Sequence, residues 1–152
     1  MTELFTPTFP DWEARARSSF AKQGLMKHLG ASIAELQPGR CVLMTAYEDE
    51  LSQHHGFFHA GVSAAIGDSA GGFAGLTLFD ADSDVLTVEF KINLIRPAAG
   101  HRLIATGTVL RLGRQLTTCE IRVDVENDGR RILCATMLQT LFAKRIGSET
   151  RF

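Results

Sequence analysis

The 152-residue sequence has little net charge and few cysteines, and each shortage excludes a class of protein. Its 16 basic and 17 acidic side chains leave a formal net charge of −1, so the overall balance does not indicate a nucleic-acid-binding surface. The three cysteines, Cys41, Cys119 and Cys134, are odd in number and widely spaced within apolar segments. They predict reduced core thiols in a cytoplasmic protein, and neither a disulfide framework nor a zinc site.

Signals of targeting and of modular construction are also lacking. Residues 1–7 contain neither the basic start nor the apolar run of a signal peptide. We find no linker, internal repeat or low-complexity segment, and the composition, 45% apolar and 22% charged, is ordinary for a globular protein. We therefore expect a single domain over residues 1–152, with a helical lead-in over residues 1–29.

One stretch lacks charge almost entirely. Residues 57–78 contain no Lys, Arg or Glu, and only His59 and Asp68 can titrate near neutral pH. Small residues fill most of the stretch, with glycines at every fourth position, at Gly67, Gly71 and Gly75. A membrane span is disfavoured, because an Asp at mid-membrane costs about 2.5–3.5 kcal/mol and the stretch is poor in Leu, Ile and Val. The pattern instead predicts a buried helix from about Ala60 to Leu76.

The remaining segments have the patterns of short helices and strands. Trp12, Ala16 and Phe20 share one face of an expected helix over residues 10–23, which precedes a helical turn over residues 25–29. Strands are expected at residues 31–37, 40–48, 87–94, 103–112, about 121–125 and 132–142. Because no second long helix is present to build parallel β-α-β units, the expected class is α+β. A helix that is apolar nearly all round must be wrapped by a curved antiparallel sheet of about six strands and covered on its remaining side.

Polar donors precede the buried helix, and one carboxylate lies within it. The segment Gln53-His54-His55-Gly56-Phe57-Phe58-His59-Ala60-Gly61 ends where the helix begins, and Asp68 follows further along. Donors at a helix start and a lone carboxylate are suited to polarising a carbonyl group and activating water. At 1.5 Å per residue, Ala60 and Asp68 lie about 12 Å apart along the axis, so they cannot serve one carbonyl group from the same helix. Two antiparallel helices in a C2 dimer would place each helix start beside the partner's Asp68.

The histidines of this segment, His54, His55 and His59, raise the question of a metal site. The segment holds no Asp, Glu or Cys to complete a ligand set, and the helix has not begun at His55. We therefore expect no metal. His54 and His55 are expected in a loop at a pocket mouth, and His59 at the helix start.

Three motifs resemble those of a known family. The segment from Gln53 to Gly61 is similar to the pattern Asn/Gln-x-x-Gly-x-x-His-Gly-Gly, with an acidic residue, here Asp68, seven residues after Gly61. Residues 85–98 are similar to a strand that leads to a basic-Pro corner, and Arg111-Leu112-Gly113-Arg114 is similar to the next turn. Over residues 25–143 the chain resembles the hotdog-fold acyl-CoA thioesterases, specifically the PaaI-like (phenylacetate-degradation) group.

The resemblance implies a hotdog-fold thioesterase in which a helix-start amide binds the thioester oxygen and a carboxylate is general base or nucleophile. Carried over by position, Asp68 is that carboxylate. Ala60, together with Gly61, supplies the amide at a position where the family usually has Gly. Gln53 stands where the family often has Asn and would position the carbonyl group or water. His59 matches the family His, and Thr87 matches a hydroxyl that helps to orient water.

The implied substrate and assembly follow from the same resemblance. A CoA substrate brings phosphate groups, which would suit Arg96 and one of Arg111 or Arg114. Phe57 and Phe58 are expected to line an apolar acyl channel. We expect a homodimer or a homotetramer (a dimer of dimers) that needs no cofactor and has no nucleic-acid or membrane partner. Two alternatives remain open, namely a hotdog hydratase or dehydratase that uses His59 and Asp68 as an acid–base pair, and a non-catalytic acyl-CoA-binding module.

Overall fold

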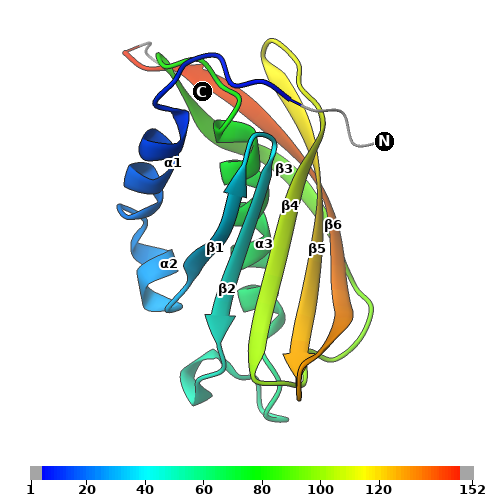
Figure 1. Cartoon of the computed structure of the whole chain (residues 1–152). Coiled ribbons are helices and arrows are strands. Elements are labelled where there is room, and N and C mark those ends of the chain that lie inside the picture. Colours follow the sequence, from blue (N-terminus) through cyan, green and yellow to red (C-terminus); the bar gives the residue numbers. More distant parts are fainter. Residues whose placement is uncertain (1–4, 148–152) are drawn as a thin grey trace.

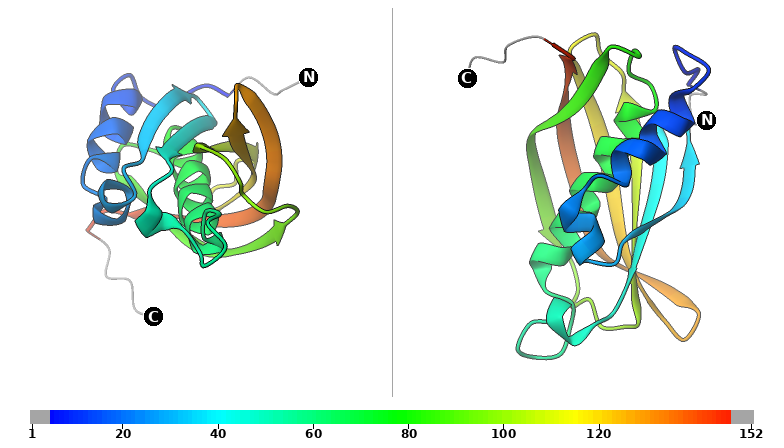
Figure 2. Two further views of the ribbon diagram at one scale, coloured as in Figure 1. Left: turned by 90° about the horizontal axis from the view of Figure 1, so that it is seen from below. Right: turned by 90° about the vertical axis from the view of Figure 1, so that its left-hand side faces the viewer.

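In the computed structural model, which describes residues 5–147, one long helix lies inside a curved sheet of six antiparallel strands. The elements are α1 (Trp12–Phe20), α2 (Gly24–His28), β1 (Ser32–Gln37), β2 (Arg40–Ala46), a 3₁₀ turn (Asp49–Leu51), α3 (Ala60–Leu76), β3 (Ser83–Leu94), β4 (Arg102–Arg111), β5 (Leu116–Asn127) and β6 (Arg130–Arg145). The strand order is β1-β2-β4-β5-β6-β3, and the short helices α1 and α2 lie beside α3, outside the curl of the sheet (Figures 1 and 2). The predicted α+β class is confirmed.

Close packing of α3 against strand β6 explains the regular glycines of the helix. A Cβ atom on each of three glycines would overlap with a residue of β6: Gly67 with Met137, Gly71 with Gln139, and Gly75 with Leu141. Each glycine costs helix propensity of about 1 kcal/mol relative to Ala. The sheet can therefore approach the helix closely along its whole length, and 12 of the 17 helical residues are buried.

Polar groups define both ends of α3. His59 has an extended conformation (φ −63°, ψ 141°) and its Nδ1 accepts a hydrogen bond of 2.8 Å from the Gly61 amide, which is the role of an N-cap residue. At the other end, the guanidinium of Arg15 on α1 donates hydrogen bonds to the carbonyl oxygens of Leu76 (2.7 Å), Phe79 (3.0 Å), Asp80 (2.7 Å) and Ser83 (2.8 Å). Burial lowers the pKa of Arg15, and the carboxylates of Asp84 and Asp80 oppose that shift. Arg15 therefore ties α1 to the carbonyl-rich end of α3.

We predict that Arg15→Met lowers the free energy of unfolding by about 2–3 kcal/mol, because four carbonyl oxygens lose a charged donor. Urea denaturation measured against wild type checks this value. Arg17→Met is the matched control on the same helix, since Arg17 makes only an exposed ion pair of 2.8 Å with Glu13 and should change stability by less than about 0.5 kcal/mol. Equal losses in both variants would contradict the role given to Arg15.

Three sequence-based expectations need correction. Helix α1 is shorter than residues 10–23: it starts at Trp12, and Gly24 begins α2 where a stop was expected. Strand β2 ends at Ala46, because the chain turns into the 3₁₀ turn. Residues 87–94 alternate between polar and apolar side chains, which predicts Val88 and Phe90 on one face of the strand, but the structure breaks this alternation. A bulge between Thr87 and Glu89 lets Thr87 and Phe90 pair with Leu141 and Gln139, two residues that face the helix.

Strand β3 lies at the edge of the sheet and leaves an apolar surface uncovered. Phe90 and Leu94 occupy helix-facing positions, yet they are 40% and 56% exposed. The uncovered stripe of α3 lies nearby and consists of Ala60, Gly61, Ala64, Ala65 and Asp68. This surface, made of β3 and the stripe, is the remaining side of the helix for which the sequence predicted a cover.

Within residues 5–147, no helix combines the length and apolarity needed to cross a membrane.

Candidate functional site

A cavity of about 420 Å³ opens at the start of α3. It lies between two loops, residues 53–58 before the helix and residues 95–98 after β3. Backbone hydrogen bonds hold the first loop in place, from the Phe58 amide to the Ala98 carbonyl (3.1 Å) and from the His59 amide to the Leu51 carbonyl (2.9 Å). The lining residues are Gln53, His55, Phe57, Phe58, Ala60, Ser63, Leu94, Ile95, Arg96, Pro97, Ala98 and Cys134. Five of the predicted site residues therefore meet here: Gln53, Phe57, Phe58, Ala60 and Arg96.

The helix start presents one free amide to this cavity. Ala60, the first residue of α3, is exposed, and no described residue accepts a hydrogen bond from its amide. The amide of Gly61, expected as a second donor, already donates to Nδ1 of His59. His59 and Gly61 line a separate hollow of about 300 Å³ beside α2. Ala60 alone thus offers an N–H at the positive end of the helix dipole, where a developing oxyanion is stabilised.

Gln53 and the two phenylalanines shape the cavity wall. The side-chain oxygen Oε1 of Gln53 accepts a hydrogen bond from the His55 amide. That leaves the –NH₂ group of Gln53 as a donor for a ligand. Phe58 is buried and packs edge-on against Tyr47 with ring centroids 5.2 Å apart, whereas Phe57 is half-buried. The wall is therefore apolar, with a few polar groups near the helix start.

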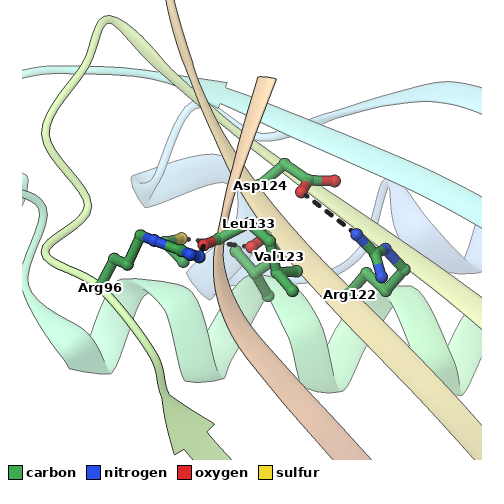
Figure 3. A network of polar contacts seen from close by, with 6 residues as sticks. Arg96, Arg122, Val123, Asp124 and Leu133 are labelled. Atoms are coloured by element: carbon green, nitrogen blue, oxygen red, sulfur yellow. Dashed lines mark hydrogen bonds and ion pairs between the residues drawn. The ribbon is translucent and has the colours of Figure 1, made fainter. Parts of the chain in front are cut away.

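Arg96 stands where the cavity meets solvent. Its Nη1 donates a 2.9 Å hydrogen bond to the Leu133 carbonyl oxygen on β6, as Figure 3 shows. The rest of the guanidinium remains exposed and can bind an anion. Cys134 also lines the cavity, but burial, with the nearby carboxylate of Asp124, raises the pKa of its thiol to about 11. Cys134 is therefore protonated at neutral pH and unsuited to act as the nucleophile.

Asp68 is the last residue of the uncovered stripe, midway along α3, and belongs to a second polar cluster. Its Oδ1 accepts hydrogen bonds from Thr87 Oγ1 (2.7 Å) and from Nε2 of Gln139 (2.6 Å). No described residue donates to its Oδ2. Asp68 does not line the cavity at Ala60, which agrees with the separation of about 12 Å expected for eight helical residues. The cavity at Ala60 and the polar cluster at Asp68 are therefore separate features of the same helix.

Two expected residues lie away from both the cavity at Ala60 and the polar cluster at Asp68. Arg111 ends β4 and Arg114 occupies the turn after it, at the opposite end of the sheet from the start of α3 (Figure 1). Arg102, at the other end of β4, is nine residues from Arg111, which corresponds to about 30 Å along a strand. Neither arginine can therefore reach the cavity at Ala60. The part of the chain that the structure describes contains no cluster of three or more His, Cys, Asp or Glu suited to a metal ion.

Gln139 and Ser63 also belong to the cluster at Asp68 and to the cavity, respectively, and were not predicted from the sequence. Gln139 follows Met137 and precedes Leu141 at alternate positions of the closing strand, so it shares their buried face. A Gln at such a position is a recognisable signal, because an amide is rarely buried without a partner. Ser63 lies one turn after Ala60 and lines the same cavity, but among so many small residues no pattern distinguishes it.

Comparisons with known proteins point to a single family. Residues 55–132 match the family model described as the thioesterase superfamily. Among curated proteins, a candidate esterase of Saccharolobus solfataricus is 33% identical over 124 residues, which is 82% of this chain and 80% of that protein. The proofreading thioesterase EntH of Klebsiella pneumoniae is 27% identical over 121 residues, covering 80% of this chain and 86% of EntH.

Solved structures give the same result. A thioesterase family protein from Silicibacter pomeroyi is 41% identical, with a TM-score of 0.87 over 88% of this chain and 98% of that one. The PaaI protein from the phenylacetic acid degradation operon of Escherichia coli is 22% identical, with a TM-score of 0.78. The match covers 91% of this chain and 95% of the PaaI chain. At that identity the PaaI likeness supports the fold alone.

Proposed function

The chain belongs to the thioesterase superfamily and has its hotdog fold, and on this premise we propose that it hydrolyses acyl-CoA thioesters. The observation that carries the proposal is the free Ala60 amide at the mouth of an apolar cavity, on the same uncovered stripe as a hydrogen-bonded carboxylate. The acyl group would occupy the cavity against Phe57 and Phe58, and the CoA portion would leave it past Arg96. Within the cavity, Gln53 would donate a hydrogen bond to the thioester oxygen or to water.

Two subunits would complete each site. The uncovered apolar surface of β3 and α3 provides a self-complementary contact around a two-fold axis, with the α3 helices antiparallel. Each Ala60 amide would then face the partner's Asp68. In that arrangement Arg111 or Arg114 of the partner subunit would approach the cavity and bind CoA phosphates. A mass measurement in solution distinguishes a dimer from a dimer of dimers.

The reaction balances with the groups present. In the general-base route, Asp68 accepts a proton from water while the water oxygen attacks the thioester carbon. The C–S bond then breaks, and the proton returns to the departing sulfur. In the nucleophilic route, a carboxylate oxygen of Asp68 displaces the thiolate to form a mixed anhydride, which water hydrolyses. In both routes the Ala60 N–H stabilises the oxyanion.

Release of free thiol tests the proposal. Purified protein is incubated with a panel of aliphatic and aryl acyl-CoA esters and a chromogenic thiol reagent, and we expect turnover on at least one class. A hydratase with His59 and Asp68 as its acid–base pair would consume an enoyl-CoA without releasing thiol. A binding module would retain acyl-CoA without turnover.

The cytoplasmic location that we propose rests on the three unpaired, buried cysteines.

Arg96→Ala should raise KM for acyl-CoA roughly tenfold and leave kcat nearly unchanged. The reason is that a charged hydrogen bond to phosphate, worth about 1.5–3 kcal/mol, is made equally in the ground and transition states. The effect should shrink for an acyl-pantetheine, which lacks the nucleotide phosphates, and at high salt. Arg122→Ala is the control, because Arg122 pairs with Asp124 away from the cavity (Figure 3). An equal loss on both substrates would assign Arg96 to the fold or the dimer.

A further inference from the structure

Gln139 is a fully buried amide whose nitrogen is surrounded by oxygen atoms of the candidate site. Its Nε2 lies 2.6 Å from Asp68 Oδ1, 3.0 Å from the Asp68 carbonyl oxygen and 3.4 Å from Thr87 Oγ1. The carboxylate and the carbonyl group can only accept hydrogen bonds, so the nitrogen end of the amide must face them. The amide thus connects the side chain of Asp68 to the backbone of the same residue.

The other end of the amide has no polar partner. Oε1 of Gln139 is buried and accepts no hydrogen bond from any described residue. It fits only because Gly71 of α3 has no side chain, since a Cβ atom there would overlap with it. A buried carbonyl oxygen without a donor lowers stability. The equivalent positions on either side, Met137 against Gly67 and Leu141 against Gly75, are apolar. Packing alone would therefore favour an apolar residue at position 139.

We propose that Gln139 is a positioning residue that fixes the orientation of the Asp68 carboxylate for catalysis. The inference rests on the proposed function, in which Asp68 activates water or attacks the thioester. With Oδ1 bound by Gln139 and Thr87, rotation of the carboxylate is restricted and Oδ2 is directed to the reacting atoms. Thr87 lies on the exposed edge strand, whereas Gln139 is held inside the sheet, so the buried amide supplies the rigid contact.

Gln139→Met separates positioning from packing. Met has a similar length and removes the unpaired oxygen, and Met137 shows that a methionine packs against a glycine of α3 at the neighbouring position. We expect an unchanged or higher melting temperature, a kcat lower by about 10–100-fold, and a KM within about twofold of wild type. Met137→Leu is the matched control, because it alters the same face of β6 without touching Asp68, and it should keep wild-type kcat.

A double variant shows whether Gln139 acts through Asp68. Asp68→Asn combined with Gln139→Met should be no slower than Asp68→Asn alone, because the carboxylate to be positioned is already gone. Two results would overturn the positioning role and leave the proposed function intact. One is an additive loss of kcat in the double variant, and the other is a wild-type kcat for Gln139→Met while Asp68→Asn is impaired. A wild-type rate for Asp68→Asn would instead overturn the catalytic role of Asp68 on which the inference rests, whereas the proposed function itself would be overturned by the absence of thiol release from the whole acyl-CoA panel with the wild-type protein. If the Met variant does not fold, Gln139→Leu replaces it, and failure of both to fold would assign Gln139 to the fold.

Discussion

Asp68→Asn should lower kcat for acyl-CoA hydrolysis by about 10²–10⁴ while the protein stays folded, the usual effect of removing a positioned base. The substitution keeps the size of the side chain and an oxygen that can accept the hydrogen bonds of Thr87 and Gln139. It removes the charge that accepts a proton or attacks carbon. Steady-state kinetics with the best substrate of the panel, together with circular dichroism, measure both quantities.

Asp84→Asn is the control for this experiment. Asp84 is an exposed carboxylate on β3, the strand that also carries Thr87, and it lies outside the cavity and the Asp68 cluster. Its variant should hydrolyse acyl-CoA at the wild-type rate. If a folded Asp68→Asn protein is as active as this control, Asp68 is not the catalytic carboxylate, and a water-activating group must be sought elsewhere.

Ala60→Pro should lower kcat by about 10²–10³, which is the effect of removing one oxyanion donor. The substitution deletes the N–H and leaves the helix in place, because proline is favoured at the first position of a helix. His59 already has the extended conformation (φ −63°, ψ 141°) that a residue before proline adopts. Circular dichroism and thermal unfolding confirm that the variant is folded before its kinetics are compared.

Ala60→Gly is the matched control, because it retains the N–H and should keep activity near that of wild type. The Pro variant should lose kcat and kcat/KM together, since the hydrogen bond strengthens as charge develops on the oxygen. A Pro variant with wild-type kcat would show that another donor stabilises the oxyanion. The amide of Gly61 is poorly suited to that task, because it donates to His59.

The long helix could be predicted from sequence to the residue. The run of small side chains around the single charged residue Asp68 predicts a helix from about Ala60 to Leu76, and α3 has those bounds. The features that the sequence did not reveal depend on contacts between distant segments. The bulge beside Thr87 shifts the register of β3 against β6, and the hydrogen bond between His59 and Gly61 depends on the geometry of the helix cap. Gln139 lies 71 residues from Asp68, and only the register of β6 against the helix brings the two together.

Subunit complementation tests the shared site most directly. Asp68→Asn and Ala60→Pro homodimers each lack one half of both sites and should be nearly inactive. When equal amounts are unfolded together and refolded, about half of the dimers are mixed, and each carries one site with an intact amide and an intact partner carboxylate. One quarter of all sites are then complete, so we predict that the mixture recovers about a quarter of the activity of the same amount of wild-type protein. Activity of the mixture no greater than the average of the two variants would contradict a site shared between subunits.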